Sequence, residues 1–531
     1  MNQASLRGRE VWAVAASCAA VSVAAIAWSW RNHALLDYGD AIAHLHIARR
    51  VFDSRFPGIT ELGSVWLPLP HLFMIPFVQV YAWWANGLAG TIPSALAWLA
   101  ACVGLYRLAR WFLPPLASAL TLAFFALNPN LLYLQTTAMT EPLFVAETIW
   151  IVLGLVEWQS ALDQNEGKIC STQSWIALVL VAAIYTRYDG WVMALLAWSA
   201  MGIVLLRRGQ LRQRSFWIWS AVLIAAPAAW FAYNAVAFGD WLEFARGPYS
   251  AKAIELRTAH GAGPPHPGWH NPWVGLLFYL KVCEMDAFAI WRHFALALSV
   301  LGTLGAWAWA RRRFAWALLL WLPAPFYAYS VAYGSVPIFL PVWWPHSWYN
   351  TRYGMELLPA LALGLGFAAQ FALVCAREFK PRWVRYAASA LAALIALNAW
   401  GLVSKGPLVY VESTRNLQAR APFDEAIPPV LRAELGGCPG GAVLMNTSVY
   451  PELVAMTGIP LRQTINESDR WIYRKALGAP AEHAALVLAF DGDAADRAVK
   501  AHPQGLRALA RFTAKGQAAG TLYASALCAQ R

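Results

Sequence analysis

The chain has 531 residues, of which 59% are hydrophobic and only 13% are charged, and its formal net charge is +12. Soluble domains carry about 25% charged residues, so the composition excludes an ordinary soluble protein and predicts a polytopic α-helical membrane protein. The 30 Trp and 19 Tyr fit this class, because their amphipathic rings favour the membrane–water boundary. The basic residues stand in short clusters between apolar runs, which is typical of loops that orient membrane helices, so no nucleic acid is expected as a partner.

A transmembrane helix needs about 20 apolar residues, and about eleven segments are predicted to be spans by that rule. They are 11–30, 91–109, 116–134, 143–160, 174–187, 190–206, 215–237, 287–310, 314–334, 354–376 and 384–404. The first is too long for the core of a signal peptide, and no small-residue cleavage pattern follows it, so we expect it to be retained.

The basic clusters predict the orientation of these spans. They are Arg7/Arg9, Arg107/Arg110, Arg207/Arg208/Arg212/Arg214, Arg311/Arg312/Arg313 and Arg377/Lys380/Arg382/Arg385. All fall on one side if the N-terminus is cytoplasmic, as the positive-inside rule requires. The apolar segment 67–86 is broken by Pro68, Pro70 and Pro76, and we expect it to lie in the interface, within a long first external loop 31–90. The prediction is a multi-pass protein of the bacterial inner membrane, surrounded by membrane lipids.

The composition of the sequence becomes more polar after residue 404. Residues 1–404 are predicted to form the membrane module, and the more polar residues 405–531 a small periplasmic α/β domain. Helices are expected at 423–435, 450–457 and 493–501, strands at 441–446, 485–490, 508–513 and 520–525, and a hairpin turn at 514–517. Cys438 and Cys528 flank the first and last strands. An oxidising periplasm permits a disulfide, and we expect these two residues to form one.

The first external loop carries an unusual polar pattern. Asp40, His44 and Ile47 share one helical face, since positions i, i+4 and i+7 lie on the same side. A carboxylate and an imidazole beside Arg49 can bind and activate a hydroxyl acceptor. An amphipathic surface helix with an Asp near its start explains the same pattern equally well.

Three further polar motifs interrupt apolar runs. Glu141 stands between the third and fourth spans, Arg187 and Asp189 lie between the fifth and sixth, and Arg352 and Tyr353 enter the tenth. A charge at the centre of a bilayer costs roughly 2.5–3.5 kcal/mol, so we expect these groups at water-facing helix ends or in a polar cavity. The simpler readings are a helix cap, a local ion pair and an interfacial anchor. The predicted topology places all of them on the external face, together with Asp40.

The loop 238–286 is also predicted to be external. It carries Arg246, Tyr249, Lys252, His260, His266 and His270 among Gly and Pro. It is either a mobile lid over a substrate or an irregular loop. The three His make a divalent metal ion a candidate cofactor, although solvent-exposed His in such a loop is the simpler interpretation.

The whole arrangement resembles the C-type membrane glycosyltransferases, in particular glycosyltransferase family 39, with its protein O-mannosyltransferases and lipid A aminoarabinose transferases. Asp40 matches the Asp of the family's first acidic motif, with Ile47-Ala48-Arg49 at the corresponding distance. Ala41 stands where the family has Glu. The Pro-rich stretch 66–71 ends in His71 and lacks the family's Lys. The motifs at 140–142, 187–190 and 352–353 also have counterparts.

This resemblance implies an inverting transfer of a sugar from a polyprenyl-phosphate donor to a hydroxyl of a glycan, lipid or protein. Asp40 would be the general base, Glu141 would shape the pocket and hold the acceptor or a metal, and Arg187 or Arg352 would balance the leaving phosphate. The other candidate substrate-binding residues are His44, Arg49, His71, Asp189, Arg246, Tyr249 and Tyr353. The alternatives are a transporter or flippase of lipid-linked sugars, a glycan polymerase or ligase, and a non-catalytic receptor.

Overall fold

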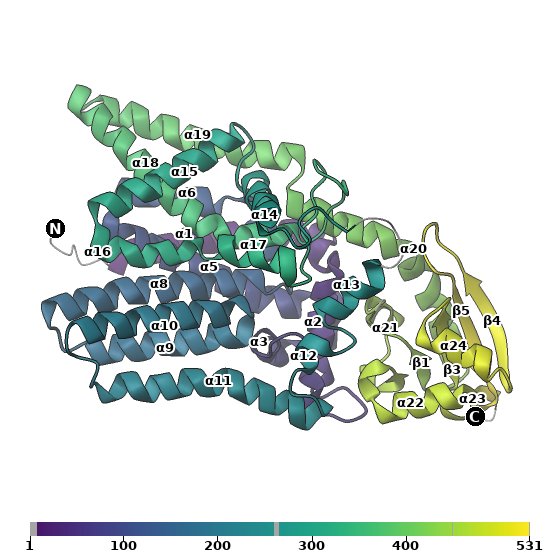
Figure 1. Ribbon diagram of the computed structural model, residues 1–531. Coiled ribbons are helices and arrows are strands. Elements are labelled where there is room, and N and C mark those ends of the chain that lie inside the picture. Colours follow the sequence, from purple (N-terminus) through teal and green to yellow (C-terminus); the bar gives the residue numbers. More distant parts are fainter. Residues whose placement is uncertain (1–7, 260–264, 449, 530–531) are drawn as a thin grey trace.

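The computed structural model describes residues 8–259, 265–448 and 450–529. A bundle of long helices occupies one end of the molecule and a small α/β domain the other, with a layer of short helices between them (Figure 1). Residue 8 lies at the end of the bundle far from the α/β domain. The predicted fold class, a polytopic membrane protein with a C-terminal α/β domain, is confirmed.

Among the described residues, nine helices are long and apolar enough to cross a membrane, and a tenth span is counted if one bent pair is included. The nine are α1 (Gly8–Arg31), α5 (Leu88–Phe112), α8 (Glu141–Gln164), α9 (Ile169–Thr186), α10 (Asp189–Arg207), α11 (Arg214–Phe238), η3 (Ala315–Trp321) with α17 (Pro323–Tyr333), η4 (Thr351–Leu357) with α18 (Leu358–Phe379), and α19 (Trp383–Lys405), which leads into α20 (Leu408–Gly436). The bent pair is α14 (Pro272–Ala287) and α15 (Arg292–Trp309), which meet at 102°. The short α16 (Arg311–Phe314) follows α15.

Two apolar segments differ from uninterrupted spans. The predicted span 116–134 is divided into α6 (Pro115–Ala126) and α7 (Pro129–Leu134). The break occurs where Asn128 caps α7 by accepting hydrogen bonds from the N–H groups of Asn130 and Leu131. The segment 67–86 forms α3 (Leu69–Val78) and α4 (Tyr81–Asn86), and neither helix is long enough to cross a bilayer.

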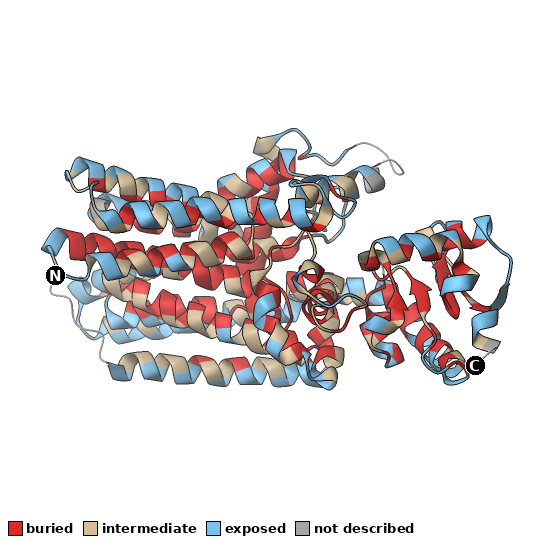
Figure 2. Cartoon of the chain, turned by 90° about the horizontal axis from the view of Figure 1, so that it is seen from below, coloured by how far each residue is buried: buried red, intermediate tan, exposed pale blue. Residues whose placement is uncertain are grey.

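The bundle is built around α8, whose apolar window is 83% buried, whereas that of the last span is only 6% buried. Buried positions therefore run through the middle of the bundle and exposed ones follow its outer helices (Figure 2). Helices α15 and α18 approach each other closely at two glycines. A Cβ at Gly302 would lie 2.1 Å from the carbonyl oxygen of Gly364, so no side chain fits there, as is common where membrane helices approach closely.

The α/β domain contains a five-stranded mixed sheet in the order β2-β1-β3-β5-β4. Its strands are β1 (Val443–Met445), β2 (Thr464–Ile465), β3 (Leu486–Phe490), β4 (Leu506–Phe512) and β5 (Gly520–Ser525), and its helices are α21 (Glu452–Thr457), α22 (Trp471–Gly478), α23 (Pro480–His483), α24 (Ala494–Ala501) and α25 (Ala526–Ala529). The four predicted strands and the turn between β4 and β5 are present. The two-residue β2 and the helix α22 were not predicted.

The layer between bundle and domain comes mainly from the segment between α1 and α5. It contains η1 (Ala34–Leu36), α2 (Gly39–Arg50), η2 (Ile59–Leu62), α3 and α4, and also α12 (Glu243–Arg246) and α13 (Ala251–Ala259). Arg50 donates to Ser468 Oγ at 2.7 Å and Arg55 to the Thr464 carbonyl at 2.8 Å, so side chains of this segment connect the α/β domain to the bundle.

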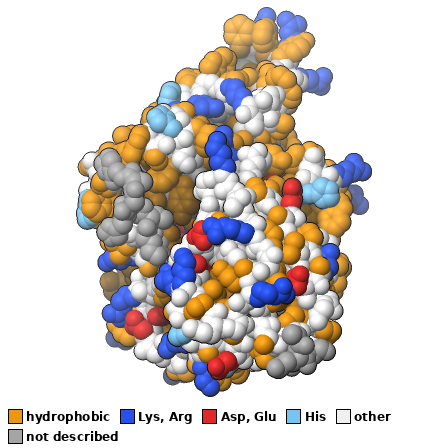
Figure 3. Space-filling view, turned by 90° about the vertical axis from the view of Figure 1, so that its right-hand side faces the viewer, with side chains coloured by type: hydrophobic (Ala, Val, Ile, Leu, Met, Phe, Trp, Pro, Cys, Tyr) orange, Lys and Arg blue, Asp and Glu red, His pale blue; other side chains and the backbone are white. Residues whose placement is uncertain are grey.

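Seen from the domain end, basic and acidic side chains are interspersed rather than gathered by sign (Figure 3).

The predicted disulfide between Cys438 and Cys528 is wrong, because both residues are free thiols in the structure. The predicted proximity is nevertheless correct. β1 runs parallel to β3, and β3 antiparallel to β5, so the start of β1 and the end of β5 share one edge of the sheet. The two thiols are in hydrogen-bond contact, and burial with the neighbouring Cys438 raises the pKa of Cys528 to about 11. Little thiolate is therefore present at neutral pH to start oxidation.

We predict that a catalytic oxidant such as copper phenanthroline closes this bond. The number of maleimides added to the denatured chain should fall by two after oxidation of the wild type. It should not fall in Cys438→Ser, which retains the other six thiols. An unchanged thiol count in the oxidised wild type would show that the two sulfur atoms cannot reach bonding geometry.

Candidate active site

Four chain segments converge on Arg352, which lies in η4 at the end of the bundle nearest the α/β domain. Its Nε donates to Glu141 Oε1 at 3.0 Å, and one Nη donates to Asp40 Oδ2 at 2.7 Å. The other Nη lies 3.4 Å from Glu412 Oε1. The three carboxylates belong to α2, α8 and α20, so one guanidinium group joins these helices to η4.

A second arginine, Arg187, extends the same network from the junction of α9 and α10. Its guanidinium nitrogens lie 3.0 Å from Glu356 Oε1, 3.3 Å from Asp189 Oδ2 and 3.5 Å from Glu141 Oε1. It also donates to the Tyr327 hydroxyl, which donates in turn to Glu356 Oε1, each at 2.7 Å. Glu141 is therefore shared by both arginines, and the two clusters form one site.

Helix ends hold these carboxylates in place. Asp40, Glu141 and Asp189 lie in the first turns of α2, α8 and α10, where the positive end of the helix dipole stabilises a negative charge. Glu412 accepts the N–H groups of Asn350 and Thr351 at 3.0 and 2.7 Å. In this way Glu412 satisfies backbone N–H donors at the start of η4. The 3₁₀ helix η4 leads directly into α18.

The five carboxylates differ sharply in their access to solvent. The Asp40 side chain is 43% exposed. Those of Glu141, Asp189, Glu356 and Glu412 are between 1% and 6% exposed. Asp40 is therefore the one carboxylate of this cluster that a substrate can reach, and the other four serve to hold the arginines.

The cluster contains five carboxylates and two guanidinium groups, so it has three more acidic than basic groups. Glu141 Oε2 and Glu356 Oε2 have no hydrogen-bond partner among the described residues. Buried charges are tolerated only when they are paired, and both arginines are fully used in pairing these acids. Neither Arg187 nor Arg352 has a positive charge to spare for a phosphate.

His44 and His71 form a buried pair on the same side of α2. His44 Nδ1 lies 2.8 Å from His71 Nε2, and Trp66 packs on the His44 ring with ring centroids 4.3 Å apart. Burial, and secondarily the charges of Arg352 and Arg187, lower the pKa of His44 to about 3, and burial lowers that of His71 well below its ordinary value. Both rings are therefore neutral. Neither provides a positive charge in place of the Lys that the resemblance to the C-type glycosyltransferases leads one to expect in the stretch 66–71.

The remaining predicted residues are divided between the cluster and its surroundings. The Tyr353 ring lies between the two arginines, with each guanidinium carbon 5.0 Å from its centroid. Arg49 lies at the far end of α2 and pairs with Asp53 at 2.7 Å. Arg246 pairs with Asp240 at 2.9 Å and is 56% exposed. Tyr249 follows α12 and is 39% exposed.

Sequence analysis missed several members of the site. Glu356 had a signal, since it interrupts an apolar run four residues after Arg352. Glu412 and Arg415 had none, because they lie in a polar segment. Arg415 is exposed, and its guanidinium carbon lies 3.6 Å from the centroid of the Trp348 ring. Next to Trp348, Tyr349 is 42% exposed, and burial together with the nearby charge of Asp40 raises its pKa to about 12.

No group of three or more His, Cys, Asp or Glu in the described part of the chain is arranged to hold a metal ion. Of the three His in the predicted lid, His260 lies outside the described residues, and His266 Nε2 lies 4.0 Å from Glu255 Oε1. The residues present therefore do not fit the candidate divalent metal ion.

The helix bundle, the acidic cluster at its end and the adjoining α/β domain define a multi-pass membrane protein with an acidic site at the junction of its two parts. No protein-family model matches the sequence, and no curated protein matches it.

Among solved structures, the chain is similar to ArnT from Cupriavidus metallidurans bound to undecaprenyl phosphate. The TM-score is 0.54 at 14% identity, and the alignment covers 95% of this chain and 97% of that chain. The apo structure of the same ArnT gives a TM-score of 0.49 at 14% identity, over 91% and 93% of the two chains. At this identity the first similarity establishes the fold.

We predict that Arg352→Met destabilises the protein strongly, because it leaves Glu412 buried without a cation and Glu141 with Arg187 as its remaining partner. Breaking a buried ion pair from one side costs about 3–5 kcal/mol. The thermal unfolding midpoint of the purified protein in detergent should fall accordingly. The matched control is Arg246→Met, which breaks an exposed pair worth less than about 1 kcal/mol. Equal midpoints for the two variants would contradict the role of Arg352.

Proposed function

We propose that this protein transfers a sugar from a polyprenyl-phosphate donor to a hydroxyl group of an acceptor at the end of the bundle that carries α2. The observation that supports this reaction most directly is the exposure of Asp40 within an otherwise buried acidic cluster. Arg352 donates to this carboxylate at 2.7 Å and so holds it in one orientation, which is what a general base requires. The shared fold with ArnT, whose structure contains undecaprenyl phosphate, supports a lipid-phosphate donor.

In the proposed step, Asp40 takes the proton of the acceptor hydroxyl while the acceptor oxygen attacks the anomeric carbon. The bond between that carbon and the phosphate oxygen breaks, and the polyprenyl phosphate leaves with the electron pair. A retaining reaction would need a second accessible carboxylate as nucleophile. The other four carboxylates of the cluster are buried, so we propose a single displacement that inverts the anomeric carbon.

We assign Glu141 a positioning role. Its side chain is 1% exposed, and its Oε1 lies within 3.5 Å of both guanidinium groups. It therefore acts on a substrate through Arg352, which orients Asp40, rather than by contact with the acceptor.

The leaving phosphate needs a cation outside the neutralised pairs, and Arg415 is the best candidate. It lies three residues after Glu412 on α20, so the two side chains share a face of that helix. Among the described residues it has no ion-pair partner, and it stacks on Trp348. Tyr349, the residue after Trp348, is 42% exposed, and its hydroxyl is a suitable hydrogen-bond donor to the same phosphate. We therefore propose that Arg415 and Tyr349 bind the phosphate.

We also propose that the site faces the periplasm of a bacterial cell, with the N-terminus in the cytoplasm. The basic clusters at 107–110, 207–214 and 377–385 follow the ends of α5, α10 and α18, while α8 and α10 begin at the acidic cluster. The arginine-rich end is therefore opposite the site, and the positive-inside rule places that end in the cytoplasm.

The base is tested by Asp40→Asn, which keeps the shape of the side chain and removes its basicity. Turnover should fall by roughly 10²–10⁴-fold, measured as polyprenyl phosphate released from a bacterial lipid extract by the purified protein. Asp240→Asn, which removes an exposed carboxylate on the neighbouring loop, is the control. Normal turnover in Asp40→Asn would exclude Asp40 as the base.

The phosphate site is tested separately with Arg415→Gln. Because the phosphate gains negative charge as it leaves, losing this cation should lower kcat/KM by roughly 10²-fold without changing the unfolding midpoint. Arg474→Gln, an exposed arginine on α22, should leave the kinetics unchanged. If Arg415→Gln has the kinetic constants of the wild type, another cation must hold the phosphate.

A further inference from the structure

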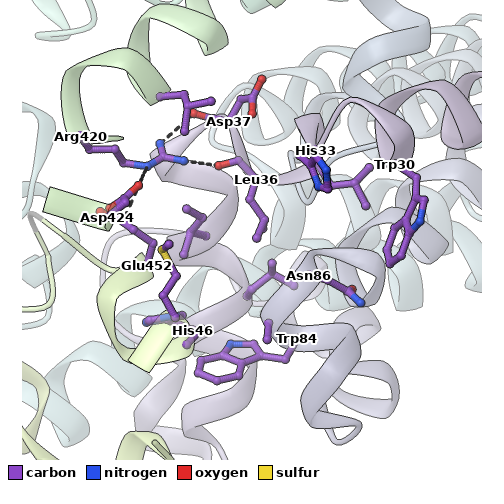
Figure 4. Close-up of a pocket in the computed structure, with 17 residues that line it drawn as sticks. Trp30, His33, Leu36, Asp37, His46, Trp84, Asn86, Arg420, Asp424 and Glu452 are labelled. Carbon is purple, nitrogen blue, oxygen red and sulfur yellow. Dashed lines mark hydrogen bonds and ion pairs between the residues drawn. The ribbon is translucent and has the colours of Figure 1, made fainter. Parts of the chain in front are cut away.

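A second cavity, of about 460 Å³, lies between the bundle and the α/β domain, on the other side of α2 from the acidic site (Figure 4). Ile42, Leu45 and His46 line it from α2, whereas Asp40 contacts Arg352 and His44 contacts His71. The size is within the range of small-molecule sites, roughly 300–1,000 Å³. None of its lining residues belongs to the acidic cluster.

One end of this cavity is apolar and lies at the level where membrane spans end. Trp30 belongs to the last turn of α1, and Trp84 to α4, which immediately precedes the span α5. Trp30 is 45% exposed, and Met456 on the opposite wall is 43% exposed. Tryptophan side chains favour the membrane–water boundary, so this end of the cavity adjoins the head-group region of the bilayer.

The other end is polar and carries too few positive charges. Arg420 is its one arginine, and it faces Asp424 at 3.3 Å and Glu452 at 3.7 Å. The same guanidinium donates to the carbonyl of Asp37 at 2.8 Å and to that of Leu36. Asp37 adds a third carboxyl group to the wall. One guanidinium group is therefore shared among three acidic side chains and two carbonyls.

Several buried polar atoms at this end have no hydrogen-bond partner among the described residues. Both oxygens of Glu452 and Oδ1 of Asp424 are in this state, although these residues are only 5% and 8% exposed. Burial raises the pKa of Glu452 well above its ordinary value, and the adjacent Asp424 carboxyl group raises it further. His46 Nε2, on the α2 wall, is also without a partner and its residue is 4% exposed. Arg420 Nε and Trp84 Nε1, which are donors, also lack a hydrogen-bond partner in the described part of the chain, but the three unpartnered carboxylate oxygens belong to the adjacent Asp424 and Glu452.

We propose that this cavity binds a membrane lipid whose headgroup carries a protonated primary amine, with the ammonium group against Asp424 and Glu452. Such an amine supplies three donors and one positive charge, which is what this end of the cavity lacks. The lipid chain would follow the apolar wall past Trp30 and Trp84 into the bilayer. The lipid would bind there whether or not Asp40 acts as a base.

The experiment compares phosphatidylethanolamine with phosphatidylglycerol of the same acyl chains, added to the purified full-length protein in detergent and measured by native mass spectrometry. We expect the wild type to retain phosphatidylethanolamine at least tenfold better. Glycerophosphoethanolamine, which has the same headgroup without chains, should not compete. Equal retention of the two lipids, or equal binding of the soluble headgroup, would overturn the proposal.

Two variants and one control locate the site. Glu452→Gln should lower retention of phosphatidylethanolamine at least tenfold without lowering the unfolding midpoint of the lipid-free protein, because it removes one of the crowded carboxylates. Met456→Trp should lower retention by filling the mouth of the cavity while all charges remain. Glu425→Gln removes the exposed carboxylate next to Asp424 and should bind as the wild type does. Wild-type retention by both Glu452→Gln and Met456→Trp would exclude this cavity as the site.

Discussion

The organisation of this protein depends on the contacts of one guanidinium group. Arg352 binds Asp40, Glu141 and Glu412, which are separated by about a hundred residues or more in the chain. A planar guanidinium with donors on three nitrogens is suited to such a position, since a lysine has one charged atom and cannot bridge three helices in this way. The pairing also explains why so many acids are tolerated in this cluster: each of its buried carboxylates lies against one of the two arginines.

The same contacts give the five carboxylates of the site different roles. Four carboxylates are shielded and fix the two arginines, and the fifth, Asp40, projects into solvent from the first turn of α2. A base must be accessible and yet held in one orientation, and these requirements are met by different parts of one network. As a consequence, the positive charges of Arg187 and Arg352 are neutralised by these carboxylates. In the proposed reaction, the leaving phosphate therefore needs a cation from outside the network, and we propose Arg415 on α20 for this role.

The sequence was most informative where charges interrupt apolar runs. Glu141, Arg187 and Arg352 were recognised because a charged residue between two apolar runs requires a reason, and Asp40 because it shares a helical face with His44. The structure brings all four together. Glu412 binds the same arginine but lies in a segment where charges are ordinary, so nothing marked it. The pairing of His44 with His71 was also hidden, because it depends on how α3 folds back on α2.

Local sequence patterns also limit how much of the fold can be predicted. The strands around β3 were predictable from their apolar runs, whereas β2 is two residues long and presents no alternation. The cap at Asn128 divides a stretch that has the composition of a full span. The disulfide prediction correctly brought two strand ends together, but proximity of two thiols does not determine their oxidation state.

The helix α20 has a consequence for how the chain can be divided. It begins three residues after the last span and ends seven residues before β1, yet its Glu412 binds Arg352 and its Arg420 holds the carbonyls that lead into α2. The connection between bundle and α/β domain is thus itself a wall of the site. A chimera that exchanges the α/β domain for that of another protein would have to place the junction beyond residue 424. A junction at 405, where the membrane span ends, would instead separate Arg352 from one of its three carboxylates.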